Sequence, residues 1–203
     1  MLDETKRDKI LQASLEEFAE YGYEKASTDR ISQRAEVSKG LIFHYFGSKS
    51  KLYMITINRC INDMLEEYKN MKTNNMDFIG NIKLLMKIKY DFFNKNPLYY
   101  RIMLNGFYNS PAELKSELQN RYFELSKIGM GIIADMIGKL PLKKDVSINN
   151  VITVIAGIQN VLENKYLYRF SNDTTSFEGV YTIVSDEFMN LLNIVMYGII
   201  DEK

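Results

Sequence analysis

Apolar side chains recur along this chain at intervals of three and four residues, which is the spacing of one face of an α-helix. Alternation of apolar and polar residues, which would predict strands, is rare, and the whole sequence contains only three prolines. The pattern therefore predicts an all-α protein of about nine helices. Representative stripes are Leu11, Leu15 and Phe18, then Ile57, Ile61, Met64 and Tyr68, and later Ile155, Ile158 and Leu162.

Several helix starts can be located from capping residues. Asn96 comes directly before Pro97, which places a capping side chain ahead of a proline at the first helical position. Residues 110–113 and 175–178 each have the sequence of a capping box. Residues 48–72 indicate one continuous helix, so we expect no flexible linker between the N-terminal part of the chain and the rest.

The character of the chain changes after its first quarter. Residues 1–52 contain three short predicted helices, whereas residues 53–203 form longer segments rich in Tyr, Phe, Met and Asn. We predict a small N-terminal domain at residues 1–52 and a larger helical domain at residues 53–203. Within the first, residues 28–52 indicate two short helices joined by a tight turn, with another helix starting immediately afterwards. That order is typical of a helix-turn-helix, whose second helix enters the major groove of DNA.

Composition indicates the size of the core, the charge balance and the compartment of the protein. The chain has 203 residues, of which 46% are hydrophobic, and this is enough for a full core. Its 26 basic and 26 acidic side chains balance, so any basic surface for nucleic acid has to be local. The one cysteine cannot form an internal disulfide, and no signal peptide or membrane-spanning stretch is evident. We therefore expect a cytoplasmic protein that does not bind membranes.

The helix-turn-helix segment assigns roles to individual residues. Thr28 is expected to cap the first of its two helices, and Ser38 to cap the second. Ile42 and Phe46 lie four residues apart and are expected to point into the core. The outward positions are Lys39, Gly40, Leu41, His44 and Tyr45.

A local surplus of positive charge follows the motif. Lys49 and Lys51 lie in the first turn of the next predicted helix, where a helix N-terminus and two ammonium groups together suit a phosphate. Residues 37–62 contain four basic side chains and no acidic one, whereas residues 1–52 as a whole balance nine against nine. The basic patch is thus confined to one end of the domain, as DNA docking requires.

These residues resemble one known family. Over roughly residues 6–53 the sequence is similar to the tetracycline-repressor (TetR) family. The similarity lies at Thr28, Ile31 and Ala35, in the runs from Val37 to Gly40 and from Phe43 to Phe46, and at Lys49 and Leu52. The resemblance implies phosphate contacts by Thr28, Lys39, Tyr45 and Lys49, and base-edge contacts by Lys39, Gly40, Leu41 and His44. Glu36 departs from the family, which usually has Gly in this turn. A left-handed backbone at Glu36 would cost about 1–2 kcal/mol. Phe43 replaces a frequent Tyr and so lacks a hydroxyl.

Aromatic residues and methionines gather between residues 92 and 123. Each can be explained as core packing, although Tyr and Met also line adaptable apolar pockets. The family resemblance implies a small-effector pocket in this region, and we expect Tyr100, Met103, Phe107 and Tyr122 near it. The expected effector is a hydrophobic or amphiphilic small molecule.

The last two long segments, residues 147–170 and 175–200, carry broad apolar faces. Two such helices can simply close the bundle. The resemblance implies instead that they pair with a second copy of the chain to form a homodimer, which reading a palindromic operator in double-stranded DNA would require.

An enzyme and a protein-binding adaptor are the alternatives to a DNA-binding regulator. An enzyme would have to work with His44 as its only histidine, so paired Glu-x-x-His motifs and Cys/His zinc sites lack ligands. Catalysis by carboxylates alone remains open, but no pair is indicated. A helical adaptor that binds only protein would not need Lys39, Lys49 or Lys51. We therefore predict a ligand-responsive, sequence-specific DNA-binding regulator with no catalytic residues, metal or cofactor. Repression is preferred over activation as its mode of action.

Overall fold

The computed structural model describes residues 2–69, 76–172 and 177–198, and every regular element within these ranges is a helix. The predicted all-α fold is confirmed. The described part of the chain forms nine α-helices and one short 3-10 helix: α1 (Leu2–Lys25), α2 (Thr28–Arg34), α3 (Lys39–Phe46), α4 (Lys49–Lys69), α5 (Phe78–Lys95), α6 (Pro97–Phe107), η1 (Ala112–Leu114), α7 (Lys115–Ile137), α8 (Ile148–Asn172) and α9 (Phe177–Tyr197).

The helices form two compact units. Unit 1 consists of Met1–Met71 and Phe92–Asn120, and unit 2 of Lys72–Asp91 and Arg121–Lys203. The helices α5 and α7 contribute residues to both units, because a unit boundary falls within each of them. The boundary predicted at residue 52 separates two functions, and it stays a prediction. The packing units divide the chain differently, since α4 and α6 pack with α1 in unit 1.

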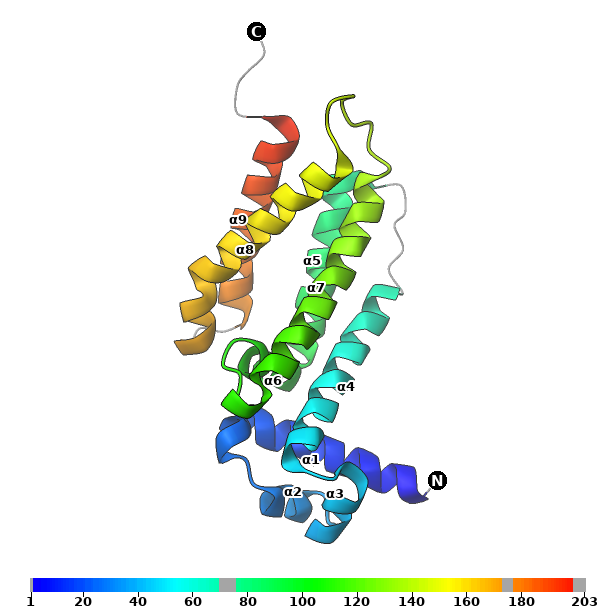
Figure 1. Ribbon diagram of the computed structural model, residues 1–203, viewed down its shortest axis with the longest axis vertical. Coiled ribbons are helices and arrows are strands. Elements are labelled where there is room, and N and C mark those ends of the chain that lie inside the picture. Colours follow the sequence, from blue (N-terminus) through cyan, green and yellow to red (C-terminus); the bar gives the residue numbers. More distant parts are fainter. Residues whose placement is uncertain (1, 70–75, 173–176, 199–203) are drawn as a thin grey trace. The chain divides into compact units, whose positions relative to one another are not determined.

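Unit 1 is organised around α1, which packs against α2, α4 and α6. Figure 1 shows α2 and α3 next to each other beside α1, and α4 crossing it. Phe18, Ile31 and Tyr53 lose their contact with solvent almost completely, and the rings of Phe18 and Tyr53 meet edge to face with centroids 4.8 Å apart. Burial of each such side chain contributes roughly 1.5–3 kcal/mol to folding. The sole cysteine, Cys60 in α4, is also in this core, and burial raises the pKa of its thiol to about 12.

Glycines at two positions allow α1 and α6 to fit this core. Gly22 has φ 68° and ψ 173°, which kinks the end of α1. The kink turns Tyr23 onto the Tyr53 ring, at a centroid distance of 5.0 Å. Gly106 in α6 has no side chain, and a β-carbon there would lie only 2.7 Å from Cδ1 of Ile57 in α4. The absence of a side chain thus lets α6 approach α4 closely.

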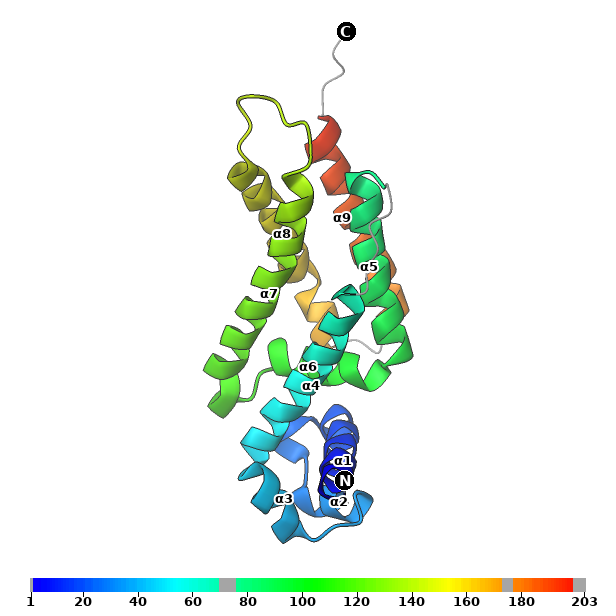
Figure 2. The ribbon, with the colours of Figure 1, turned by 90° about the vertical axis from the view of Figure 1, so that its right-hand side faces the viewer.

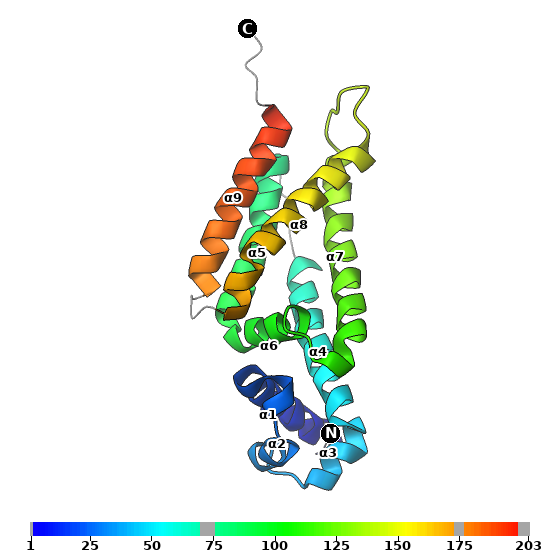
Figure 3. The same cartoon turned by 60° about the vertical axis from the view of Figure 1, so that its left-hand side comes forward.

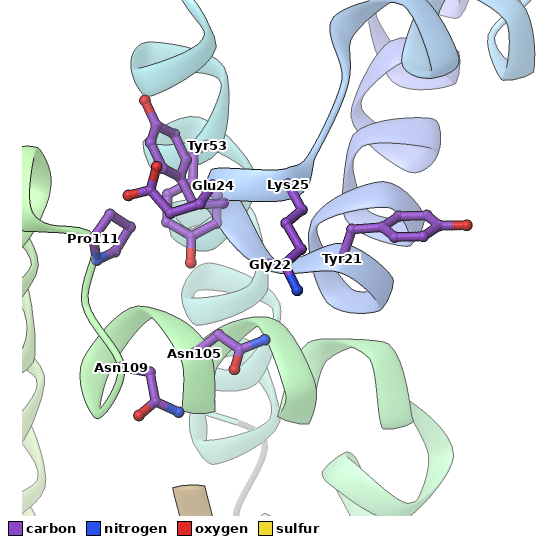
Figure 4. A pocket seen from close by; sticks show the side chains of 9 residues that line it. Tyr21, Gly22, Glu24, Lys25, Tyr53, Asn105, Asn109 and Pro111 are labelled. Atoms are coloured by element: carbon purple, nitrogen blue, oxygen red, sulfur yellow. The ribbon is translucent and has the colours of Figure 1, made fainter.

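A pocket of about 230 Å³ lies within unit 1 between the end of α1 and α6. Figure 4 shows the amides of Asn105 on α6 and of Asn109 just after α6 below it, while Tyr21 extends away from the other labelled side chains. The Tyr53 hydroxyl is buried beside the pocket without a hydrogen-bond partner among the described residues. The lining residues are Tyr21, Gly22, Tyr23, Glu24, Lys25, Tyr53, Asn105, Asn109 and Pro111.

Unit 2 is built from most of α5 and α7 together with α8 and α9. In Figures 2 and 3, α5 and α9 run side by side, and Tyr90 of α5 meets Tyr181 of α9 with ring centroids 4.7 Å apart. The helix α8 packs against α9, and it is joined to α7 by a hydrogen bond from the Tyr122 hydroxyl to Glu163 at 2.5 Å. Ile155, Leu162 and Leu192 form the buried apolar contacts of α8 and α9.

Two of the predicted helix starts need correction. Ser110 does not form a capping box, because its hydroxyl donates to the Gly106 carbonyl at 2.5 Å and α7 begins only after η1. Asn96 does occupy the capping position before Pro97, but its side chain donates back to the Phe92 carbonyl instead of capping α6. The capping box predicted at residues 175–178 lies partly outside the described residues. None of the helices described is long and apolar enough to span a bilayer.

Candidate DNA-binding site

The helix α2 begins with a cap supplied by Ser27. The Ser27 side chain accepts hydrogen bonds from the backbone N–H groups of Asp29 and Arg30, at 3.2 and 3.5 Å. The prediction that Thr28 caps this helix was therefore wrong by one residue. The Ser27 backbone is extended, with φ −117° and ψ 123°, whereas Thr28 is already the first helical residue. Thr28 remains half-exposed at the start of α2.

The turn between α2 and α3 requires an unusual backbone. Glu36 has φ 55°, and it is the one non-glycine residue with positive φ in the described part of the chain. Glu36 thus adopts the left-handed conformation at the position where the family usually has Gly, and the cost of about 1–2 kcal/mol applies to it. The N–H of Val37 donates to the Ser32 carbonyl at 3.0 Å and closes the turn. The Glu36 carboxylate meets the Lys9 ammonium at 3.3 Å on the surface.

The helix α3 has one buried and one accessible face. Ser38 caps it as predicted, because its hydroxyl accepts the N–H of Leu41 at 3.2 Å. Ile42 and Phe46 are 1% and 3% exposed, which confirms that they point into the core. On the other face, Lys39, Gly40 and His44 are exposed, and Leu41 and Tyr45 are half-exposed. An eight-residue helix with this division can present its outer face to a groove while its inner face stays packed.

A buried carboxylate holds the motif onto α1. Glu17 is fully buried and accepts the backbone N–H of Ser27 at 2.8 Å and the guanidinium Nε of Arg30 at 2.8 Å. Arg34 lies 3.7 Å from the second oxygen of the same carboxylate. Sequence reasoning missed this group. The available signal was the pair Glu16 and Glu17, which lies between the apolar residues Leu15 and Phe18 of the stripe on α1.

The predicted phosphate ligands already have contacts within unit 1. Lys39 pairs with Asp29 at 2.9 Å on the exposed surface, and both side chains remain about half-exposed or more. The Lys49 ammonium donates to the Glu24 carbonyl at 3.3 Å and lies 4.7 Å from the centroid of the Tyr23 ring. An ammonium group has three donors, so these contacts leave capacity for a phosphate oxygen. Ser48 caps α4 by accepting the N–H of Lys51 at 3.1 Å, a cap that the sequence analysis did not assign.

The residues predicted to lie near an effector fall into both units. Tyr100, Met103 and Phe107 are on α6 in unit 1, where Met103 is 6% exposed and burial raises the pKa of Tyr100 to about 12. Tyr122 is on α7 in unit 2. Their joint role in binding an effector stays a prediction.

Comparison with known proteins places the motif in a family. Residues 10–54 match the sequence model of bacterial regulatory proteins of the tetR family. The HTH-type transcriptional activator FasR of Mycolicibacterium smegmatis is 24% identical over 114 residues, which are 56% of this chain and 52% of FasR. This alignment thus spans about half the length of that relative. The biofilm operon icaADBC HTH-type negative transcriptional regulator IcaR of Staphylococcus aureus is 25% identical over 194 residues, which are 94% of this chain and 98% of IcaR.

The fold recurs among solved structures. The crystal structure of a TetR-like transcriptional regulator from Rhodococcus sp. RHA1 superposes with a TM-score of 0.67 at 14% identity, covering 92% of this chain and 95% of the other. The capped helix-turn-helix with its accessible α3 face, the match over residues 10–54 and the shared all-helical fold lead to one conclusion. Residues 10–54 of the chain are a helix-turn-helix of the tetR family of bacterial regulatory proteins.

Proposed function

We propose that this protein is a sequence-specific transcriptional repressor that binds operator DNA and is released from it by a small effector. The observation that carries the proposal is the accessible face of α3, which is backed by a buried core and capped by Ser38. The relatives point to regulation in both directions, since FasR is named an activator and IcaR a negative regulator. IcaR aligns along nearly its whole length, which favours repression. Such a protein would act in the cytoplasm by recognition of DNA and would need no catalytic step.

The outer face of α3 suits direct readout of base edges. We assign this role to Lys39, Gly40, Leu41 and His44, of which Lys39 and His44 supply hydrogen-bonding groups and Leu41 an apolar contact. A β-carbon at Gly40 would lie 4.0 Å from the Ser38 hydroxyl and would otherwise face open space. Because Gly40 has no side chain, its backbone can come close to the DNA. Phosphate contacts are assigned to Thr28, Lys39, Tyr45 and Lys49, and Ser38 completes the DNA-binding set at the start of α3.

The outer faces of α8 and α9 suit a homodimer. Val154 and Val161 lie seven residues apart on α8 and are 45% and 60% exposed. On α9, Ile183, Ile194 and Tyr197 are 43%, 48% and 72% exposed. Apolar side chains repeated along two neighbouring helices indicate a surface that a partner covers. A second copy of this chain is the partner that a palindromic operator calls for.

The apolar stripe that the sequence showed on α8 is not this surface. Ile155, Leu162 and Tyr166, which belong to that stripe, are at most 6% exposed inside the chain's own unit 2. The homodimer contact is therefore proposed for the adjacent, exposed face of the same helix, which carries Val154 and Val161.

The proposed response to the effector follows from linkage. An effector that binds the conformation with lower affinity for DNA weakens operator binding by the factor by which DNA weakens effector binding. A coupling of about 1–3 kcal/mol corresponds to roughly 5- to 150-fold release. Within unit 1, α6 packs on both α1 and α4, so a shift of α6 reaches the helices that hold the motif.

Binding of the full chain to its own upstream intergenic DNA tests the proposal. Fluorescence anisotropy at two salt concentrations, with random DNA of equal length as competitor, separates specific from non-specific binding. Tight, salt-sensitive binding that survives the competitor is the expected result. If neither this DNA nor any fragment selected from the genome outcompetes random DNA, the chain is not a sequence-specific regulator.

A further inference from the structure

One acidic side chain does not lie where its sequence context predicts. Residues 110–113 have the order of a capping box, in which the final carboxylate would return to the backbone at the start of its own helix. Glu113 instead lies in η1, and its Oε1 atom accepts a hydrogen bond from the hydroxyl of Tyr23, 90 positions earlier in the chain. Within unit 1, this contact joins the segment after α6 to the end of α1.

The segment that carries Glu113 is anchored on the core of unit 1. Pro111 is buried directly before η1, and Leu114 at the end of η1 is 6% exposed. The hydroxyl of Ser110 donates to the Gly106 carbonyl and ties the start of the segment to α6. The Glu113 carboxylate therefore extends from a fixed base, although the residue itself is exposed.

Tyr23 connects this carboxylate to the apolar core. Its ring centroid lies 6.3 Å from that of Phe18 and 5.0 Å from that of Tyr53, whereas Glu113 fixes the hydroxyl end. Burial raises the pKa of Tyr23, the bond to Glu113 raises it further, and a side-chain interaction with Ser50 of α4 opposes the rise. The hydroxyl therefore stays protonated at neutral pH and can donate to Glu113.

The ammonium group of Lys49 lies over the ring of Tyr23. It is 4.7 Å from the ring centroid, within the range of a cation–π contact, and it donates to the Glu24 carbonyl at 3.3 Å. Both contacts come from consecutive residues at the end of α1, directly after the kink at Gly22. The orientation of Tyr23 therefore decides where the ammonium group is held. Lys49 is itself half-exposed, so it can still meet a phosphate.

We propose that Tyr23 and Glu113 are positioning residues for the contact between Lys49 and a DNA phosphate. Glu113 holds the hydroxyl of Tyr23, and the Tyr23 ring and the Glu24 carbonyl hold the ammonium group where a phosphate oxygen can accept a further N–H. This role rests on the phosphate contact proposed above for Lys49, and it extends the DNA-binding machinery to a residue beyond α6. A lysine held in place before binding loses less side-chain entropy when DNA docks.

Removal of the Glu113 carboxylate tests this role in the full-length protein. Glu113→Ala leaves the Tyr23 hydroxyl without its acceptor and should weaken operator binding about threefold to tenfold, the usual effect of one hydrogen bond. Glu113→Gln keeps an oxygen acceptor and should recover most of that loss. Glu117→Ala removes an exposed carboxylate from the first turn of α7 and should not weaken binding. Fluorescence anisotropy measures each affinity, and the thermal midpoint shows whether each variant is folded.

A double-mutant cycle with Lys49→Ala separates positioning from a general structural role. Lys49→Ala removes the group that Glu113 positions, so addition of Glu113→Ala should cause no further loss of affinity. Tyr23→Phe keeps the ring but lacks the hydroxyl, and it should match Glu113→Ala in both backgrounds. Glu113→Ala should also lower the slope of log affinity against log salt, by no more than Lys49→Ala does. An equal loss from Glu113→Ala with and without Lys49, or an affinity that Glu113→Ala leaves unchanged, would overturn the proposal.

Lys49→Ala alone distinguishes failure of this role from failure of the proposed function. If it weakens operator binding and Glu113→Ala does not, the positioning role fails and the regulator stands. If it changes neither the affinity nor the salt slope, Lys49 makes no phosphate contact and there is nothing for Glu113 to position. If no operator is found, the repressor role fails, and the same cycle on random DNA decides the positioning role, because phosphate contacts do not depend on sequence.

Discussion

The carboxylate of Glu17 accepts the backbone N–H of Ser27 and the Nε of Arg30, each at 2.8 Å. One fully buried side chain of α1 thus fixes both the residue that caps α2 and a side chain in the first turn of α2. The other polar contacts between α1 and the motif, Lys9 with Glu36 and Glu20 with Arg34, lie at the surface, so Glu17 supplies the buried polar contact between them.

Replacement of Glu17 by Ala should destabilise unit 1. The Ser27 N–H would lose its acceptor, and Arg30 would turn to water, so we expect a loss of about 1.5–3 kcal/mol in the free energy of unfolding. Urea unfolding followed by circular dichroism measures it. Glu20→Ala removes an exposed carboxylate of the same helix, which pairs with Arg34 at 3.1 Å, and should have little effect. Equal losses in the two variants would show that Glu17 has no special role.

Lys49→Ala should weaken binding to every DNA sequence alike. Loss of one phosphate contact lowers the slope of log affinity against log salt by about 0.9. Titration of operator and random DNA at several salt concentrations gives the slope. Lys69→Ala, at the other end of α4, is the control, since Lys69 is exposed and pairs with Glu66. An unchanged slope together with a lower thermal midpoint would mean that Lys49 only supports Tyr23 and the end of α1.

Gly106→Ala should destabilise the contact between α6 and α4. The new β-carbon would lie 2.7 Å from Cδ1 of Ile57, and overpacking of this kind costs about 1–3 kcal/mol. Addition of Ile57→Val removes that methyl group and should recover part of the loss. Gly131→Ala on α7 meets no neighbouring atom within 4 Å and should stabilise its helix by up to about 1 kcal/mol. Thermal unfolding of the four proteins distinguishes a steric clash from a general effect of alanine.

Val161→Glu should dissociate the proposed homodimer. A carboxylate on the outer face of α8 would lose water on association, and the symmetry of the dimer would bury two copies. Light scattering coupled to size exclusion should give the mass of one chain for the variant and of two for the unmodified protein. Val146→Glu is the matched control, because Val146 is 38% exposed in the loop before α8. A dimer that persists in Val161→Glu would place the contact elsewhere.

The local features of the motif could be predicted from sequence because they depend on neighbours in the chain. Ser38 caps α3, and Ile42 and Phe46 are buried, as capping chemistry and helical spacing indicated. The cap at Ser27 was assigned one residue too late, because Ser and Thr are adjacent and both suit an N-cap.

Features that depend on which side of a helix meets which neighbour could not be predicted in this way. The apolar stripe of α8 contains Leu162, yet the more exposed valine is its immediate neighbour Val161. Both faces of that helix are apolar, so periodicity alone does not separate the core from the proposed dimer surface. The role of Glu17 likewise depends on Ser27, which lies 10 positions further along the chain.

The thiol of Cys60 can serve as a built-in probe for opening of the unit 1 core. The chain has one thiol, 1% exposed in α4 and with its pKa raised to about 12, so the closed protein offers a thiol reagent almost no thiolate. The rate of labelling then reports how often the core of unit 1 opens to solvent. Operator DNA that binds only the closed form would slow labelling in proportion to occupancy, which makes recognition measurable without a tag.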